Sequence, residues 1–243
     1  MTDLDLHFIG TGNAFAPGGL CWNGFVANGT FLFEAPPQAL QSLNKLGVDP
    51  NGIEAVVLSH HHGDHFLGLP FLLLHWKHMG RRTPVTIVGP PETEQITRAI
   101  CAQVFPGDLE SGYALEWRTA TPGEPITIGG LTLESVPVKH DSRLTQSLGY
   151  HCNLEGRQFA YTGDSSMCDG VLELARRSEV LISECASREQ RIPVHMNLVD
   201  DMPRLRAALP TDSTLLLTHV NTDVTDHGLA RTIVARDFER YRF

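Results

Sequence analysis

The segment Ser59–His65 constrains the fold of this chain more than any other, because it places four histidines and one aspartate directly after an apolar run. Residues 55–58 predict a buried strand and residues 66–79 predict a helix, so the polar cluster lies on a strand-to-helix turn. Side chains on such a turn can converge on one point. Imidazole nitrogens and carboxylate oxygens are ligands that zinc accepts at about 2.0–2.2 Å. The segment therefore predicts a metal site.

The ligand types favour a catalytic metal over a structural one. A structural zinc more often binds thiolates, and no cysteine lies near the cluster. The five cysteines are scattered and include no Cys-x-x-Cys pair: Cys21, Cys101, Cys152, Cys168 and Cys185. This distribution argues against a disulfide framework and against a zinc ribbon. We therefore expect a metal that keeps an open position for water.

Length and charge limit the remaining classes. A chain of 243 residues with no linker, repeat or charge block is expected to form a single domain over residues 1–243. No apolar run approaches the roughly 18 residues of a membrane span, and the acidic N-terminus does not resemble a secretory signal. We expect a cytoplasmic protein without membrane association. The net charge of −9 disfavours long nucleic acid as a partner.

Strand and helix signals follow one another in an order that predicts two mixed sheets. Strands are expected at 4–10, 24–27, 30–34, 53–58, 84–88, 113–120, 126–128, 131–138, 147–154, 158–161, 180–183 and 214–218. Helices are expected at 35–46, 66–79, 92–104, 169–177 and 198–208, with a short helix at the C-terminus. Two sheets packed face to face with helices outside would account for this order. The predicted fold is an α/β four-layer αββα sandwich.

Three later polar residues each end an apolar run. His140 follows 136–138, Asp164 follows 161–163 and His219 follows 215–218. Strand ends along one edge of a sheet gather at one rim, where α/β folds build their sites. A lone histidine after a strand is more often structural, but several of them together with the cluster at 59–65 favour one shared metal site.

The combined pattern resembles the metallo-β-lactamase superfamily. Its His-x-His-x-Asp-His motif and its three later ligands are matched in order by His60, His62, Asp64, His65, His140, Asp164 and His219, and residues 8–13 are similar to its first strand and turn. The resemblance covers almost the whole chain. It implies two metal ions, one held by His60, His62 and His140 and the other by Asp64, His65 and His219, with Asp164 between them.

A site of this kind implies hydrolysis. Two dications about 3.5–4 Å apart depress the pKa of a bridging water, so that hydroxide is available near neutral pH, and they bind anionic oxygens of the substrate. The flavodiiron relatives have a glutamate at position 62, where this chain has a histidine. We therefore expect a hydrolase that uses a hydroxide bound by two divalent metal ions. Zinc is favoured, with manganese and iron as alternatives.

Glu184 and His195 narrow the substrate class. They are similar to a glutamate and to the histidine of a His-x-Thr type motif in the ribonuclease Z branch, although Asn197 stands where Thr or Ser is usual. The resemblance implies that Glu184 orients His195, which acts as general acid or stabilises developing charge. Asp64, Glu184 and His195 are thus the candidate catalytic residues. Alternatively, His195 is an exposed loop histidine beside a residue that caps helix 198–208.

One segment of ribonuclease Z has no counterpart here. Ribonuclease Z carries a long arm that clamps tRNA, inserted between the ligands that match His140 and Asp164. These two residues are only 24 positions apart, and predicted strands fill the interval. The expected substrate is a small or cyclic phosphodiester, as in arm-less cyclic-phosphate phosphodiesterases of this branch. The alternatives are a tRNA 3′-processing endoribonuclease, a carbonyl hydrolase (lactonase, thioesterase or β-lactamase-like) and a non-catalytic carrier or binding protein.

Residues 66–79 also predict a partner, because they are apolar on nearly every face of the expected helix. One face can pack on the sheet, and the rest needs another cover. Dimers are similarly arranged in the ribonuclease Z branch, so we expect a homodimer through helix 66–79. Near the ligands, His61 is expected to point away from the metals, whereas Lys139 and Arg143 could reach a substrate anion or lie at the surface.

Overall fold

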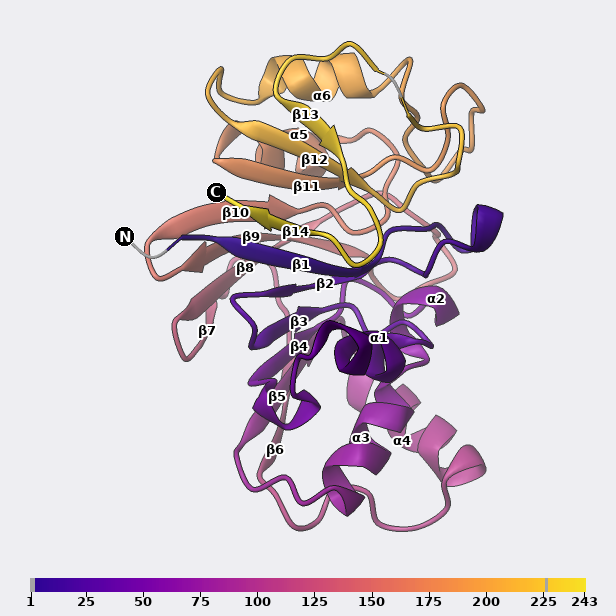
Figure 1. The fold of residues 1–243 in the computed structure, drawn as a ribbon, viewed down its shortest axis with the longest axis vertical. Helices are drawn as coiled ribbons and strands as arrows, with labels where there is room; N and C mark the ends of the chain where they lie inside the picture. Colours follow the sequence, from indigo (N-terminus) through magenta and orange to yellow (C-terminus); the bar gives the residue numbers. More distant parts are fainter. Residues whose placement is uncertain (1–2, 226) are drawn as a thin grey trace.

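The computed structural model, which describes residues 3–225 and 227–243, contains two seven-stranded sheets packed face to face (Figure 1). The first sheet has the spatial order β14 (Arg240–Arg242), β1 (Asp5–Gly10), β2 (Gly24–Ala27), β3 (Phe31–Phe33), β4 (Ala55–Val57), β5 (Val85–Gly89) and β6 (Leu115–Thr119). The second has the order β13 (Thr232–Val234), β12 (Thr214–Thr218), β11 (Val180–Glu184), β10 (Arg157–Tyr161), β9 (Leu148–Leu154), β8 (Leu131–Pro137) and β7 (Ile126–Ile128).

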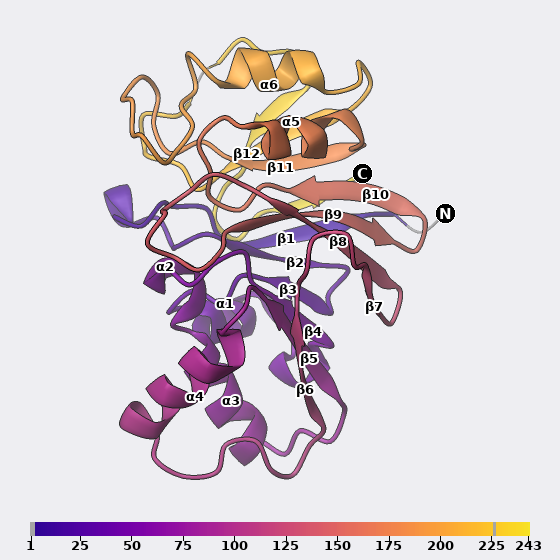
Figure 2. The same cartoon turned by 180° about the vertical axis from the view of Figure 1, so that it is seen from behind.

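Helices cover the outer face of each sheet, as Figure 2 shows from behind. Those on the first sheet are α1 (Ala39–Leu46), α2 (Gly63–Phe66), α3 (Leu69–His78) and α4 (Thr93–Val104). Those on the second sheet are α5 (Asp169–Arg176) and α6 (Met202–Ala208). Two single turns of 3₁₀-helix complete the elements, η1 (Pro17–Gly19) and η2 (Pro50–Gly52). The predicted four-layer αββα sandwich is confirmed.

Successive strand residues pack into different layers, which explains the apolar runs of the sequence. Phe8 and Phe25 lie in the core between the two sheets, whereas their neighbours Ile9 and Val26 lie in the core under the helices. Alternate side chains of a strand point to opposite faces, so a strand buried on both faces is apolar at every position. A third core lies under α5 and α6.

Aromatic rings fix the two sheets against each other beside the site. Phe25 stacks on Phe33 with ring centroids 4.7 Å apart and meets Tyr161 of the opposite sheet edge-on at 5.4 Å. Such pairs contribute about 0.5–1.5 kcal/mol beyond the burial of their area. Phe33 and Tyr161 end β3 and β10, so this packing also positions the residues that follow, Glu34 and Asp164.

The expected C-terminal helix is wrong, because the C-terminal segment forms two edge strands instead. β13 pairs in parallel with β12, and β14 pairs antiparallel with β1. Each strand has only three residues. β14 finds its backbone partners on β1, near the other end of the sequence, and β13 finds them on the preceding strand β12; these hydrogen bonds outweigh the local helix signal.

Two predicted helices have different limits in the structure. The predicted helix 66–79 begins only at Leu69 as α3, and the short helix α2 before it consists mostly of residues from the predicted ligand turn. Gly68 lies between the two helices; its N–H donates to Ala35 O at 2.8 Å, and a Cβ atom there would lie 2.0 Å from Pro36 O. Helix 198–208 begins only at Met202. Asn197 accepts the N–H of Asp200 at 2.7 Å and closes a turn there instead of capping a helix.

Among the described residues, no helix has both the length and the apolar character that crossing a bilayer would require.

Candidate metal centre

The predicted ligands gather where strands of both sheets end. The turn after β4 carries the histidine cluster, and the ends of β8, β10, β11 and β12 are followed by or include His140, Asp164, Glu184 and His219. The bend before Asp164 requires Gly163, whose φ is +58° and whose Cβ would lie 2.7 Å from that of Ser59. His219 also has a positive φ, of 53°. Left-handed backbone at residues other than glycine is costly and concentrates at functional sites.

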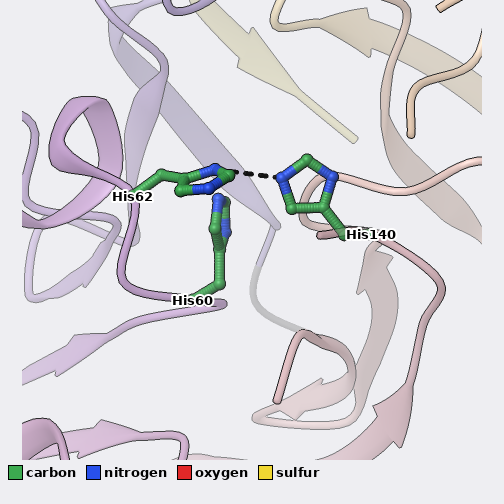
Figure 3. Close-up of side chains that lie close together, drawn as sticks. All are labelled: His60, His62 and His140. Carbon is green, nitrogen blue, oxygen red and sulfur yellow. Dashed lines mark hydrogen bonds between the residues drawn. The ribbon is translucent and has the colours of Figure 1, made fainter. Parts of the chain in front are cut away.

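His60, His62 and His140 form the first ligand group, with ligand atoms within 4.8 Å of one another. Figure 3 shows the three rings converging, with His62 Nδ1 only 3.0 Å from His140 Nε2. His60 is fully buried, and its Nε2 has no hydrogen-bond partner. Ser59 Oγ lies 2.9 Å from the other nitrogen of this ring, Nδ1, and orients it.

The outward nitrogens of His62 and His140 reveal their tautomers. His140 Nδ1 faces Val194 O at 3.0 Å, and His62 Nε2 faces Asp141 Oδ2 at 3.3 Å. Carbonyl and carboxylate oxygens only accept, so both outward nitrogens carry the proton. In the neutral rings the two inward nitrogens are then bare lone pairs that repel each other. Tetrahedral zinc would hold two such nitrogens about 3.3 Å apart, so the geometry fits a bound cation.

Asp64, His65, Asp164 and His219 form the second ligand group, again within 4.8 Å. His65 Nε2 lies 3.3 Å from Oδ2 of both aspartates. His219 Nε2 lies 3.4 Å from Asp64 Oδ2 and 3.2 Å from Asp164 Oδ2. Asp164 Oδ1 and His219 Nδ1 are buried without a hydrogen-bond partner. Buried carboxylates are normally paired or bound to metal, so this group fits a second cation.

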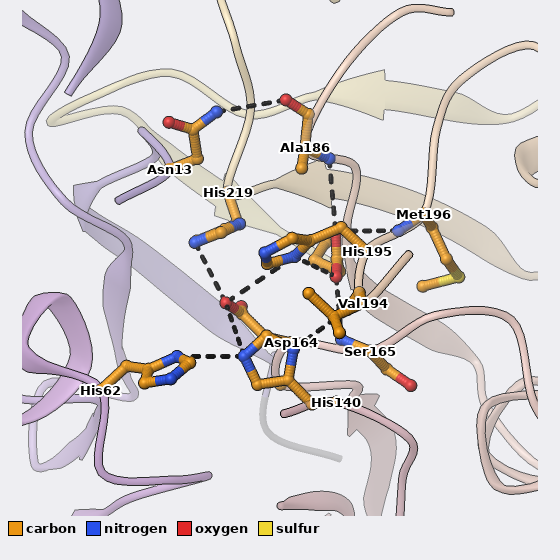
Figure 4. Close-up of polar contacts among 12 residues, drawn as sticks. Asn13, His62, His140, Asp164, Ser165, Ala186, Val194, His195, Met196 and His219 are labelled. Carbon is orange, nitrogen blue, oxygen red and sulfur yellow. Dashed lines mark hydrogen bonds and ion pairs between the residues drawn. The ribbon is translucent and has the colours of Figure 1, made fainter. Parts of the chain in front are cut away.

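Asp164 lies between the two groups. Its Oδ2 is 3.9 Å from His60 Nε2 and 4.0 Å from His140 Nε2 in the first group, besides its contacts with the second. Figure 4 shows Asp164 between His140 of the first group and His219 of the second. Burial alone would raise the pKa of Asp164, but His219 and His65 hold it well below its usual range. The carboxylate is therefore ionised and accessible from both ligand groups.

Glu34 belongs to the site, although the sequence did not single it out. It is fully buried directly after β3, its φ is +64°, and its Oε1 lies 3.4 Å from His65 Nδ1. Its Oε2 accepts the N–H of Ser59 at 3.3 Å. A carboxylate on the far nitrogen of a histidine fixes the ring and raises its basicity as a ligand. The sequence does contain a signal for Glu34, because an acidic residue directly after the apolar run 31–33 is expected to lie at the end of a strand, as the metal ligands do.

Glu184 and His195 meet as expected. His195 Nδ1 lies 2.9 Å from Glu184 Oε1, and the carboxylate also accepts three backbone N–H groups, from Ser165 at 2.8 Å, Ala186 at 3.2 Å and Met196 at 3.3 Å. Burial would lower the pKa of His195, but the hydrogen bond and the charge of Glu184 outweigh it and raise the pKa to about 9. Glu184 thus favours the protonated imidazole.

The His195 ring lies against the metal ligands. Its centroid is 5.3 Å from that of His219 and 5.0 Å from that of His140. The side chain is only 16 % exposed. The alternative of an exposed loop histidine is therefore wrong. All seven predicted ligands and the Glu184–His195 pair are brought together at one place.

The neighbouring residues have other partners. His61 Nε2 lies 2.8 Å from Thr93 Oγ1, which directs this ring to the start of α4 and away from the ligands, as expected. Arg143 binds the carboxylate of Asp141 two residues earlier.

Comparison with known proteins places this geometry among related folds. A family model described as the β-lactamase superfamily domain matches residues 26–220. A ribonuclease Z of Methanosarcina acetivorans is 23% identical over 283 residues, covering 92% of this chain and 89% of that protein. The metallo-β-lactamase fold protein YhfI of Bacillus subtilis superposes with a TM-score of 0.80 at 21% identity, over 100% of both chains. A diphosphatase of the PhnP family superposes with a TM-score of 0.79 at 21% identity, over 99% of this chain and 98% of that one.

Proposed function

The chain belongs to the β-lactamase superfamily, in its ribonuclease Z-like branch, and on that premise we propose that it is a metal-dependent phosphodiesterase acting on small or cyclic phosphodiesters. The observation that carries this proposal is the Glu184–His195 pair. It sets a proton donor directly beside the metal ligands.

Two divalent ions, which we propose to be zinc, would be held by the two ligand groups. His60, His62 and His140 would bind one ion, and Asp64, His65 and His219 the other, with the Asp164 carboxylate between them. When bound, the two ions supply Lewis acidity, which makes a water more acidic and stabilises negative charge on phosphoryl oxygens. A ligand set made only of histidine nitrogens and aspartate oxygens also accepts manganese or iron.

His195 acts on the leaving group in this proposal. Glu184 holds the Nδ1 proton, so Nε2 is the nitrogen that can give a proton to the departing oxygen. An alkoxide leaves a phosphodiester with difficulty unless it is protonated, and a positioned acid is worth about 10²–10⁴ in rate. Carbonyl hydrolases of the superfamily generally lack a counterpart of this pair, which favours phosphorus over carbonyl carbon.

The backbone after His140 supports a small substrate. Strands β9 and β10 account for most of the interval up to Asp164, and a loop of 141–147 is the longest connection in it. No inserted arm is present among these described residues, and the net charge of −9 opposes binding of a polyanion. The names of two similar proteins, a diphosphatase and a ribonuclease, describe cleavage at phosphorus.

A substrate panel on metal-defined protein tests the proposal. We expect zinc- or manganese-loaded protein to hydrolyse bis(p-nitrophenyl) phosphate and 2′,3′-cyclic nucleotides with a higher kcat/KM than lactones, thioesters or β-lactams. Chelator-treated protein is the control and should be inactive until metal is restored. Clear lactonase or thioesterase activity without any phosphodiester turnover would contradict the proposal. Efficient 3′-processing of pre-tRNA would favour the endoribonuclease alternative.

We also propose a homodimer through residues 66–79, the segment predicted as one helix, which contains the end of α2 and all of α3. Leu69, Leu72 and Trp76 of α3 are buried inside the chain, whereas Leu67 and Phe71 are 43% and 46% exposed. Light scattering at micromolar concentration should give the mass of a dimer, and Phe71→Glu should shift it to that of a monomer by burying a charge. Val199→Glu, at a similarly exposed apolar residue outside this helix, should leave the mass unchanged. A monomeric wild-type protein would refute the dimer.

A further inference from the structure

Asp141 lies on the outward side of the metal ligand His62. It directly follows His140, and its Oδ2 is 3.3 Å from His62 Nε2. The aspartate side chain is only 10% exposed although it lies in a loop. Nothing in the sequence pattern singled it out, because its contact with His62 depends on the path of the chain after β8.

Two contacts hold this carboxylate in place. Arg143 donates its backbone N–H to Asp141 Oδ1 at 2.9 Å, and its guanidinium donates to Oδ1 at 2.8 Å and to Oδ2 at 2.5 Å. The N–H of Leu144 donates to Asp141 O at 3.1 Å and closes the turn. Farther along the loop, Thr145 donates to the carboxylate of Glu92 at the start of α4. The loop is therefore anchored at both ends, with Asp141 facing the ligands.

His62 depends on such a partner more than the other ligands of its group. Its side chain is 35% exposed, whereas those of His60 and His140 are 0% and 1% exposed. The two buried rings are fixed by packing. The His62 ring has more freedom to rotate, and either of its nitrogens could carry the proton if no acceptor selected one.

We propose that Asp141 is the positioning residue of the first metal ion: it accepts the Nε2 proton of His62 and thereby presents the bare Nδ1 to the ion. A carboxylate in this place fixes the tautomer, restricts the ring and raises the basicity of the ligand nitrogen. Arg143 keeps the carboxylate oriented through its hydrogen bonds to both carboxylate oxygens. The competing interpretation is an ordinary surface ion pair between Asp141 and Arg143, which would contribute little to stability and nothing to metal binding.

Metal affinity distinguishes the two interpretations. We expect Asp141→Ala to lower the affinity for one of the two zinc ions by about 10- to 100-fold in chelator competition. The affinity for the other zinc ion should be unchanged. Asp141→Asn keeps an oxygen that can accept the Nε2 proton of His62, so its zinc affinity should fall less than that of Asp141→Ala. Arg143→Gln leaves the carboxylate beside His62 and should also lose less than Asp141→Ala. Glu110→Gln is the matched control, because Glu110 binds Arg98 with two hydrogen bonds away from the site.

Cobalt-substituted protein gives a second readout. The visible absorption of the cobalt in the first position should change in Asp141→Ala and not in Glu110→Gln, since only the former frees a ligand ring. Wild-type affinity for both metals and an unchanged cobalt spectrum in Asp141→Ala would overturn the proposal. The metal-free variants should melt at the temperature of the metal-free wild type, which excludes a general loss of folding. The readout is metal binding, so the result stands whichever substrate the enzyme hydrolyses.

Discussion

Asp164→Ala is expected to lower kcat/KM on a phosphodiester by about 10³-fold or more and to reduce the bound metal below two equivalents. Asp164 Oδ2 is the atom that lies within 4.0 Å of nitrogens from both ligand groups. Removing it takes a negative charge from both metal positions at once. A loss of about 4 kcal/mol of charge stabilisation in the transition state corresponds to that factor in rate. Elemental analysis and steady-state kinetics on the same samples measure both effects.

The comparison with Asp164→Asn separates charge from shape. The amide is nearly isosteric, so it preserves the packing but removes the formal charge that attracts the cations. We expect it to retain more metal than the alanine variant and to lose most of the activity. Asp169→Asn is the control, because Asp169 is exposed in the first turn of α5, five positions later in the chain. Two bound equivalents and wild-type kcat/KM in Asp164→Ala would show that the carboxylate is dispensable.

The ligands could be predicted because each has a signal within a few residues of itself. Apolar strand residues followed by a histidine or an aspartate place the polar group at a sheet rim, and the structure brings these rims together. Glu34 carries the same signal after 31–33, but it has no motif around it and was overlooked. Asp141 carries no signal of this kind, since only the turn stabilised by Arg143 brings it to His62.

The errors in the predicted fold have a common cause, which is contact between distant segments. Ala35 and Pro36 approach Gly68 between α2 and α3, a contact that the local sequence does not show, although Pro70 in the first turn of α3 does mark a new helix start. The strands β13 and β14 are too short to show the alternation of a half-buried strand. They form because β12 and β1 would otherwise be unpaired edge strands. Pairing with β13 and β14 covers these edges and protects them from other chains.

His195→Ala should lower kcat by about 10²–10⁴ on a 2′,3′-cyclic nucleotide, whose leaving oxygen needs a proton. The kcat of the same variant on bis(p-nitrophenyl) phosphate should fall much less, because p-nitrophenoxide leaves without being protonated. KM should change little on either substrate if the residue acts on the departing group and not in binding. Glu184→Gln should give an intermediate loss with the same dependence on the leaving group, since it weakens the charge that keeps His195 protonated.

Metal content decides whether His195 is a proton donor or an additional ligand. His195 also belongs to two further groups of residues whose ligand atoms lie close enough together to hold a metal ion. One group contains His140 and Asp164, and the other contains Glu184 and His219. A donor can be removed without losing metal, so His195→Ala should bind two equivalents with wild-type affinity. If the variant loses metal and its activity falls equally on both leaving groups, His195 is a ligand. The Glu184 contact favours the donor, because it raises the pKa of His195 to about 9 and stabilises the protonated ring, whereas a metal ligand must be the neutral imidazole.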